Sequence, residues 1–472
     1  MPPSLPTWRL FQRILSCVCA HVGTAMSVHA DDLRVGAASV NITPPVGIPM
    51  AGYYATRLAA GTHDPLNVKA IVFAQDGAKA ALVALDLVTL ARPTIVEARR
   101  LIASLTGVPP EAVMISATHS HTGPLLNGIS TRNAVYGGDL EIAKNYTTTL
   151  AGKIAEAVRL AEIALTPAKL SAAIGREESL PFNRRFFMKD GSVGWNAGKL
   201  NPNIVRPAGP TDPAVPVVYA ESRTGKPLAT YVNFAMHLDT VGGLDFSADY
   251  AFTLATLLSR VKSPEMLTLF TIGCAGDINH INTGSKDPQK GPAEGERIGT
   301  VLGAEVLKTF TRLATITTHA PRARQQSIKL ALPTLAPGDV DRARALATRI
   351  GSKNDPNFLE KVWAFAVLDT FGRDGQPLEV EVQVIAVSPE VAWVSLPGEI
   401  FVELGLAIKA ASPFKHTLIA ELANGSIGYI PTQRAYAEGN YEPISARCAA
   451  GSGERLVAAA TQLLQELHAT FR

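Results

Sequence analysis

Short apolar runs rich in β-branched residues alternate with longer amphipathic stretches along most of this 472-residue chain. Runs of the first kind predict buried or half-buried strands, and apolar residues at helical spacing predict helices. The expected strands are Ala70–Phe73, Ala80–Leu87, Ala112–Ala117, Leu228–Phe234, Leu267–Ile272, Leu378–Val387 and Val391–Leu396. The expected helices are Thr94–Leu105, Leu140–Ile163, Tyr250–Val261, Ala293–Phe310, Asp339–Ile350 and Gly451–Leu467. The fold class that follows is α/β, with mixed sheets flanked by helices.

The length and the apolar content of 47% allow a substantial core, in one large domain or two ordinary ones. Composition shifts near Pro321, but polar motifs on both sides of it fit one site, so we expect a single domain over residues 31–472. Pro and Gly gather in a long irregular stretch from Pro181 to Pro216, and loops of that length are often functional. The net charge is only +3 with no basic block, so nucleic acid is not an expected partner.

The first thirty residues differ in character from the rest. Arg9 and Arg13 precede a mildly apolar run over residues 14–28, and Ala30 ends a small-residue cleavage site. This pattern predicts a signal peptide at residues 1–30 and a periplasmic or secreted protein. An untidy N-terminus is the alternative, because polar residues and a glycine interrupt the run. The run is too short for a helix that crosses a bilayer, so the mature chain is expected to have no transmembrane segment.

Two histidines stand where the predicted strand Ala112–Ala117 gives way to a loop, in Ala-Thr-His119-Ser-His121-Thr-Gly-Pro. Site residues often lie at such positions. On an extended segment, side chains two apart point to the same side, so both imidazoles could face one cavity. A pair of packed or solvated histidines is the other reading.

Further polar residues follow other apolar runs. His237 ends Tyr-Val-Asn-Phe-Ala-Met-His, and Glu399 follows a Pro-Gly turn and opens a helix predicted over Ile400–Ala411. Histidines and a carboxylate are the ligand types of a catalytic zinc ion. However, a core histidine and a first-turn acid would explain His237 and Glu399 equally well. Tyr429 and Tyr441 could be packing residues, and spacing alone does not select the ligands.

Taken in order, five segments resemble the motif series of the neutral/alkaline non-lysosomal ceramidases. They are His119-Ser-His121-Thr-Gly-Pro, Phe-Ala-Met-His237, Gly276-Asp277-Ile-Asn279, Pro397-Gly-Glu399 and Gly428-Tyr429-Ile-Pro-Thr. The resemblance runs from about Val35 to Tyr441 and implies a zinc-dependent hydrolase that cleaves the amide bond of ceramide or a related N-acyl lipid with metal-activated water. It also implies these roles: zinc ligands His119, His237, Glu399 and Tyr429; proton transfer by His121; contact with the scissile carbonyl or its oxyanion by Tyr441 and Arg184.

The chain departs from the family pattern in two respects. Asn279 stands where ceramidases have a serine, so a covalent mechanism there is not expected, and Asn279 with His280 are candidate substrate-binding residues. The C-terminal immunoglobulin-like module of the longer ceramidases is not expected here. These departures favour an alternative in which the same metal site cleaves a more soluble amide, ester or glycan-derived compound. A non-catalytic binding protein is a third reading.

Four aspartates could support the metal ligands from behind or could be structural caps and turns. They are Asp64, Asp86, Asp239 and Asp249.

Overall fold

Nine strands form the largest sheet, with the order β14-β12-β11-β6-β1-β3-β4-β5 and with β16 paired to β6. The computed structural model describes Met1 and residues 32–471, which form one unit from Asp32 onward. The strands are β1 (Arg34–Asn41), β3 (Asn67–Gln75), β4 (Ala78–Leu85), β5 (Val113–Ala117), β6 (Thr166–Arg176), β11 (Ala214–Ser222), β12 (Pro227–Phe234), β14 (Leu267–Ile272) and β16 (Ala314–Thr315). Most neighbours are antiparallel, but β4–β5 and β12–β14 are parallel.

A second sheet has four strands in the order β17-β18-β19-β21. These are β17 (Arg322–Leu330), β18 (Leu378–Ala386), β19 (Val391–Ser395) and β21 (His416–Ala420), and β19–β21 is parallel. The other strands form four small sheets. One has three strands in the order β10 (Ile204–Pro207), β8 (Arg185–Met188) and β9 (Val193–Trp195). The other three are pairs: β13 (Asp245–Phe246) with β2 (Gly61–Thr62), β15 (Ile278–Asn279) with β7 (Phe182–Asn183), and β20 (Glu399–Ile400) with β22 (Tyr429–Ile430).

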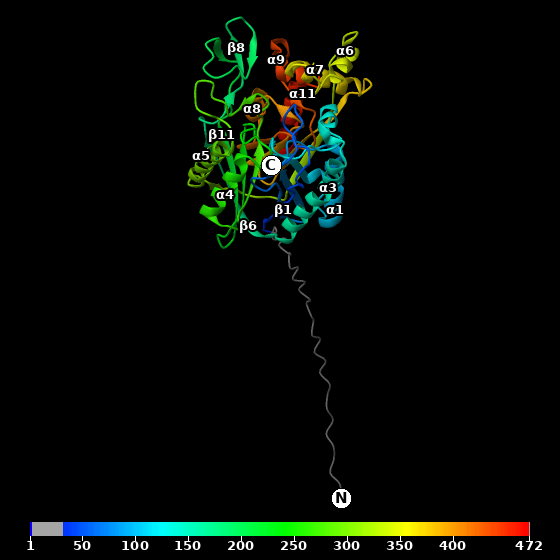
Figure 1. Ribbon diagram of the computed structural model, residues 1–472. Coiled ribbons are helices and arrows are strands. Elements are labelled where there is room, and N and C mark those ends of the chain that lie inside the picture. Colours follow the sequence, from blue (N-terminus) through cyan, green and yellow to red (C-terminus); the bar gives the residue numbers. More distant parts are fainter. Residues whose placement is uncertain (2–31, 472) are drawn as a thin grey trace. The chain divides into compact units, whose positions relative to one another are not determined.

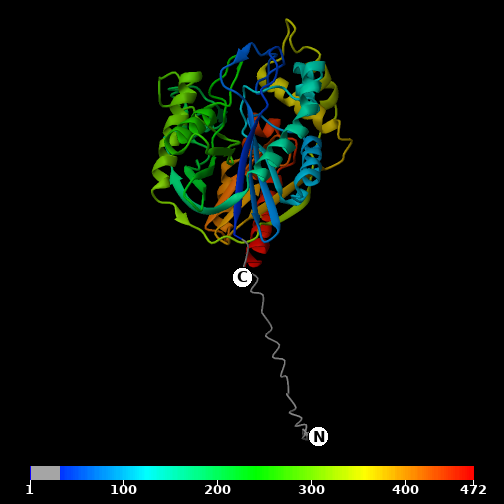
Figure 2. The same ribbon diagram turned by 90° about the horizontal axis from the view of Figure 1, so that it is seen from below.

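The helices cover the outer faces of the two sheets. Figures 1 and 2 show α1 (Arg92–Thr106) and α3 (Glu141–Ile163) at one end of the nine-stranded sheet and α4 (Tyr250–Lys262) and α5 (Pro292–Phe310) at the other end. Helix α3 packs on β1 and β3, α4 packs on β14, and α5 packs on β6 and β11. Helices α8 (Val402–Ala411) and α11 (Ser452–Ala469) cover the four-stranded sheet. The remaining α-helices are α2 (Thr131–Asn133), α6 (Asp339–Ala347), α7 (Phe358–Phe371), α9 (Gln433–Glu438) and α10 (Tyr441–Ser445), and there are a 3-10 helix, η1 (Pro110–Ala112), and a π-helix, η2 (Ala134–Gly138).

The core lies between the two sheets because their strands alternate. Ile385, Trp393 and Leu418 of the smaller sheet join the core of the larger one, whereas Val384 and Val394 face α8 and α11. The Trp393 ring stacks on Phe73 of β3, with the ring centroids 5.4 Å apart. Two sheets packed face to face with helices outside both give four layers.

The α/β expectation is confirmed, with mixed sheets flanked by helices. The stretch from Pro181 to Pro216 is less irregular than its composition indicates, because it contains four short strands, β7 to β10. The signal peptide expected at residues 1–30 falls on residues 2–31, which lie outside the described part of the chain. Among the described helices, none combines the length and the apolar character needed to cross a membrane.

Candidate metal centre and active site

Three pairs of parallel strands end at one place in the fold. β4–β5 and β12–β14 lie in the larger sheet, and β19–β21 lies in the smaller one. A bridge between Ser116 and Ala423 joins the end of β5 to the segment after β21. The N–H of Glu421 donates to the carbonyl of Ile272 at the end of β14. The carboxyl ends of strands from both sheets therefore meet, a position where α/β proteins commonly place their sites.

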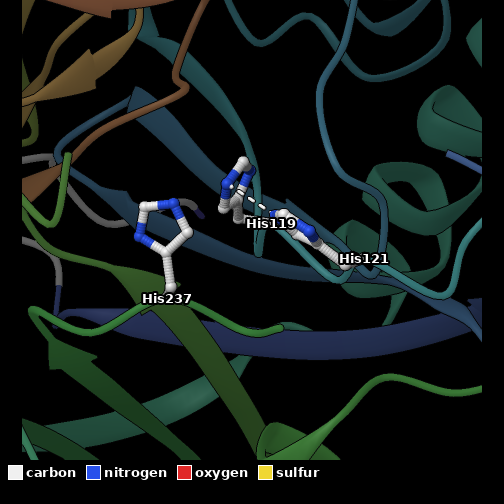
Figure 3. A group of neighbouring side chains, drawn as sticks. All are labelled: His119, His121 and His237. Carbon is white, nitrogen blue, oxygen red and sulfur yellow. Dashed lines mark hydrogen bonds between the residues drawn. The ribbon is translucent and has the colours of Figure 1, made fainter. Parts of the chain in front are cut away.

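Three histidines lie at this meeting point. His119 and His121 follow β5, and His237 follows β12. Figure 3 shows their imidazoles gathered together, with the Nε2 atoms of His119 and His121 3.1 Å apart. One ring nitrogen from each histidine lies within 4.8 Å of the other two, close enough for a shared metal ion.

The backbone brings His119 and His121 together in a different way from the one the sequence indicates. His119 has φ 74°, in the left-handed region, so the segment is not extended there. A residue with a Cβ is disfavoured in this conformation by roughly 1–2 kcal/mol. Backbone bonds hold the segment on both sides: the N–H of His119 donates to Leu87 and the N–H of His121 donates to Leu238. Strain of this kind is found mostly at functional sites.

Backbone carbonyls fix the tautomers of two histidines. The Nδ1 atom of His119 lies 2.9 Å from the carbonyl oxygen of Val88. The Nδ1 atom of His237 lies 2.8 Å from that of Ala275 and 3.0 Å from that of Ile278. Carbonyl oxygens only accept, so both Nδ1 atoms carry hydrogen and both Nε2 atoms present a lone pair. This is the arrangement usual for metal-binding histidines.

Glu399 faces the same lone pairs. Its Oε2 lies 3.4 Å from Nε2 of His119 and 3.3 Å from Nε2 of His237, and it has no hydrogen-bond partner among the described residues. Burial alone would raise the pKa of Glu399, but a proton on the imidazoles of His119 and His237, in the place a cation would take, holds this pKa well below its ordinary value. Burial lowers the pKa of His237, and Arg184 lowers it further.

Glu399 lies in strand β20 and does not open a helix, so the helix predicted over Ile400–Ala411 is wrong at its start. The carbonyl of Ile400 accepts from Gly276, and its N–H donates to the Glu421 carboxylate. Those partners hold the peptide in an extended form, and α8 begins at Val402, whose N–H donates to the Asp277 carboxylate. Nothing near Glu399 in the sequence encodes these distant partners.

Strand β20 also places Glu399 directly beside Tyr429. The two residues are partners in the parallel β20–β22 pair, and the N–H of Glu399 donates to the carbonyl of Gly428. Tyr429 is buried. Burial raises the pKa of Tyr429 well above its ordinary value, Arg184 opposes the rise and Glu399 adds to it.

This set of atoms fits a metal ion. Two imidazole lone pairs and an unpartnered carboxylate oxygen converge, and acceptors buried together in this way repel unless a cation or a proton joins them. Without a metal ion, Arg184 Nη1 lies 3.3 Å from Nε2 of His237 and His121 Nε2 lies 3.1 Å from Nε2 of His119. Nitrogen and oxygen ligands at a buried site suit zinc. His119, His237 and Glu399, with Tyr429 adjacent, would hold it; the three-histidine group that includes His121 is a second possible ligand set.

A cavity of about 280 Å³ opens onto this cluster. Of the predicted site residues, five line it: His119, His121, Glu399, Tyr429 and Tyr441. Tyr441 is held by aromatic neighbours, with its ring centroid 4.5 Å from that of Trp195 and 5.1 Å from that of Phe358. Burial raises the pKa of Tyr441 well above its ordinary value, so its hydroxyl is a hydrogen-bond donor at neutral pH.

His121 is fixed from behind while its ring faces the cavity. Its carbonyl accepts from Arg57, and a Cβ on Gly52 would lie only 2.7 Å from the Cβ of His121. Only glycine therefore fits at position 52, where φ is also 100°. Burial lowers the pKa of His121 well below its ordinary value; His119 lowers it further and Asp239 opposes this.

Arg184 lies behind the cluster, outside the cavity wall. Its Nε donates to Glu442, its Nη2 donates to the carbonyl of Gly276, and its Nη1 lies 3.3 Å from Nε2 of His237. Glu442 is fully buried and also pairs with Arg185 at 2.9 Å. Burial would lower the pKa of Arg184, but Tyr429 and Glu442 hold it well above its ordinary value.

Asn279 and His280 also lie outside the cavity wall. The Asn279 side chain donates to Asn196 and accepts from the N–H of Ile281. His280 Nε2 lies 2.7 Å from the carbonyl oxygen of Gln289. Both residues are buried and engaged within the protein.

The four aspartates have different roles. Asp64 accepts from Ser247 and Ala248, Asp86 accepts from Asn67, and Asp249 caps α4. These three are structural. Asp239 lies 3.3 Å from Nδ1 of His280, and its charge opposes the lowering of the His121 pKa.

Sequence reasoning missed a group of arginines at the cavity. Arg132, Arg373 and Arg447 line it, as does Asp369. None of them belongs to a motif, and the only signal was their presence in polar segments. Their position depends on tertiary packing, which brings α2, α7 and α10 to the same wall.

Comparisons with known proteins identify the fold. No protein-family model and no curated protein sequence matches the chain. The crystal structure of neutral ceramidase from Pseudomonas aeruginosa is similar with a TM-score of 0.73 and 18% identity, over 93% of this chain and 75% of that one. A structure of a ceramidase complexed with C2 is similar with a TM-score of 0.70 and 18% identity, over 94% of this chain and 75% of that one. The chain thus has the fold seen in ceramidase structures.

Proposed function

We propose that this chain is a member of the neutral ceramidase family and a zinc-dependent amide hydrolase. One observation carries the proposal: the lone pairs of His119 and His237 and the unpartnered Glu399 oxygen converge at the edge of a cavity, on a fold shared with ceramidases. Tyr429 would complete the ligand set. A zinc ion bound there would act as a Lewis acid and lower the pKa of water in the site.

The chain's own residues would divide the other tasks. His121 would accept a proton from the attacking water and pass it to the leaving nitrogen as the C–N bond breaks, which yields a carboxylate and an amine. Tyr441 would donate its hydroxyl hydrogen to the carbonyl oxygen as negative charge develops there. Arg184, held by Glu442, would add positive charge beside His237.

The substrate class is an N-acyl compound, with ceramide or a related N-acyl lipid as the first candidate. The alternative is a smaller and more polar amide or ester at the same site. It is supported by the cavity volume of about 280 Å³ and by the three arginines in its wall. Asn279 does not reach the cavity, so no nucleophile is proposed at that position.

The test measures metal and activity together. Zinc content of the purified protein is determined, and hydrolysis of C12-ceramide, N-acyl amino acids and O-acyl esters is followed before and after chelation. We expect about one zinc per chain and amide cleavage that chelation abolishes and zinc restores. Glu399→Gln should lose both the metal and the activity, while Glu403→Gln, at the surface of α8, serves as the matched control. A protein without zinc that still cleaves amides would refute the proposal.

A further inference from the structure

The positive charges in the cavity wall are only partly balanced. Arg447 pairs with Asp369 through two hydrogen bonds, at 2.7 and 3.0 Å. The other oxygen of Asp369 accepts from the N–H of Thr131 at 2.9 Å. The Asp369 carboxylate is therefore already paired with Arg447, and among the described residues it forms no ion pair with Arg132 or Arg373.

Arg132 and Arg373 are the two wall arginines without an acidic partner. Neither forms an ion pair with a carboxylate within the described residues, whereas Arg184, Arg185 and Arg447 each do. Arg373 donates to the carbonyls of Gln376 and Pro377, which carry no charge. Both side chains are partly exposed to the cavity.

Arg132 is held close to the reacting centre. It is the central residue of α2, whose N-cap Ser130 accepts from the N–H of Asn133, and its guanidinium lies 5.1 Å from the ring centroid of Tyr54. Burial would lower the pKa of Arg132, but Tyr54, Tyr441 and Glu399 hold it above its ordinary value. A permanently charged planar guanidinium thus stands in the same cavity as Glu399 and Tyr441.

We infer that the substrate carries an anionic oxyacid group, a carboxylate or a phosphate, and that Arg132 with Arg373 binds this group next to the scissile bond. Of the two substrates proposed above, this selects the smaller and more polar compound over ceramide. That the bound molecule is a substrate rests on the proposed function, whereas the anion site itself is inferred from the arginines alone. Guanidinium groups match the planar geometry of such anions and bind them through paired hydrogen bonds. If a metal ion is bound as well, the cavity contains the positive charges of this ion and of the arginines. A substrate with a neutral headgroup would leave these charges uncompensated.

The test uses three probes that cannot be hydrolysed: hexyloxyacetate, hexyloxyethyl phosphate and neutral hexyloxyethanol. Calorimetry on the intact, metal-loaded protein should show at least one anion bound about tenfold or more tightly than the alcohol. The tighter of the two anions distinguishes carboxylate from phosphate. Arg132→Gln should remove most of this preference, Arg373→Gln part of it, and Arg132→Lys should retain some. Arg100→Gln, an exposed surface variant with the same change of charge, should retain all of it.

Two results would overturn the inference. One is equal affinity of the wild type for the alcohol and both anions, including no measurable binding of any. The other is a preference that persists when Arg132 and Arg373 are both replaced, since the metal would then bind the anion. A turnover assay distinguishes failure of the anion site from failure of the proposed function. If the protein cleaves neither N-hexanoylglycine nor N-hexanoylethanolamine but still prefers the anions, the hydrolase proposal is contradicted and the anion site is supported.

Discussion

At the scale of single residues, the choice of tautomer separates ligand from acid–base group. His119 and His237 donate from Nδ1 to backbone carbonyls, which commits their Nε2 atoms to accepting. His121 differs, because its buried Nδ1 has no partner among the described residues. An imidazole with no structural bond at Nδ1 can carry its hydrogen on either nitrogen, so Nε2 of His121, which faces the cluster, is free to accept or donate a proton. The geometry therefore favours His121 as the proton carrier over His121 as a third ligand.

We expect His121→Ala to retain about one zinc per chain while kcat falls by about 10²–10⁴-fold, the usual contribution of a general acid–base group. KM should change little, because the residue acts on a proton and does not hold the substrate. Zinc analysis and steady-state kinetics on one preparation check this. Loss of zinc in this variant would instead favour the three-histidine ligand set.

Asp64 makes stability depend on pH in a direction opposite to that of most carboxylates. Burial raises its pKa from 3.8 to about 6, although Ser247 and Ala248 donate to it. The folded state then binds more protons than the unfolded state between about pH 4 and 6, so the free energy of unfolding falls as pH rises through this window. At about 1.4 kcal/mol per pKa unit the loss is at most about 3 kcal/mol.

The expected outcome is that Asp64→Asn gains thermal stability relative to the wild type as pH rises from 4 to 7. Asparagine can still accept from Ala248 but never ionises. Calorimetric melting temperatures of both proteins at pH 4, 5, 6 and 7 measure the difference. A difference that stays constant over this range would show that Asp64 does not titrate there.

At the scale of elements, the sequence predicts some regular segments closely and misses others. Strands β1, β6, β11 and β17 and helix α7 have no counterpart among the expected elements. The strand expected at Leu267–Ile272 is present with those bounds, and the helix expected at Leu140–Ile163 begins one residue later, at Glu141. In both, local periodicity and burial agree. The site segments depend on distant partners, as with the left-handed backbone of His119 and strand β20. No local pattern could place Arg132, because its neighbours in the cavity come from α7 and α10.

Glu421 is the residue that joins the site elements. Its Oε2 accepts from the N–H of Ile400 at 2.7 Å and of Ala275 at 3.2 Å, which ties β20 to the end of β14. Burial raises the pKa of Glu421 well above its ordinary value, and Glu399 raises it further. Burial therefore favours the neutral carboxyl, and an amide closely matches the shape of a neutral carboxyl.

Glu421→Gln should therefore change the free energy of unfolding by less than about 1 kcal/mol and keep the metal. Glu421→Ala leaves two buried N–H groups without an acceptor and should cost about 2–4 kcal/mol. Denaturation midpoints of both variants, with zinc content as a second readout, check the pair. Equal destabilisation by both substitutions would mean that the carboxylate acts as a charge.

At the scale of the whole unit, the candidate metal centre joins the two sheets. His119 and His237 come from the nine-stranded sheet, and Glu399 and Tyr429 follow strands of the four-stranded sheet. The composition shift near Pro321 coincides with β17, where the second sheet begins. Other polar contacts join the two sheets, such as the hydrogen bond from the Gln383 side chain of β18 to the carbonyl of Val113 in β5, at 3.3 Å. A metal ion bound by these residues would add one more link between two sheets that already share a core.

Zinc should therefore stabilise the folded unit as a whole. A ligand that binds only the folded state adds RT ln(1 + [L]/Kd), about 4 kcal/mol when zinc is present at a thousand times its Kd. We expect a melting temperature several degrees higher with zinc than after chelation, in one transition for both sheets. Glu399→Gln should abolish the increase, and Glu403→Gln should retain it. An increase of equal size in Glu399→Gln would place the stabilising ion elsewhere, and two separate transitions after chelation would show that the shared core alone does not couple the sheets.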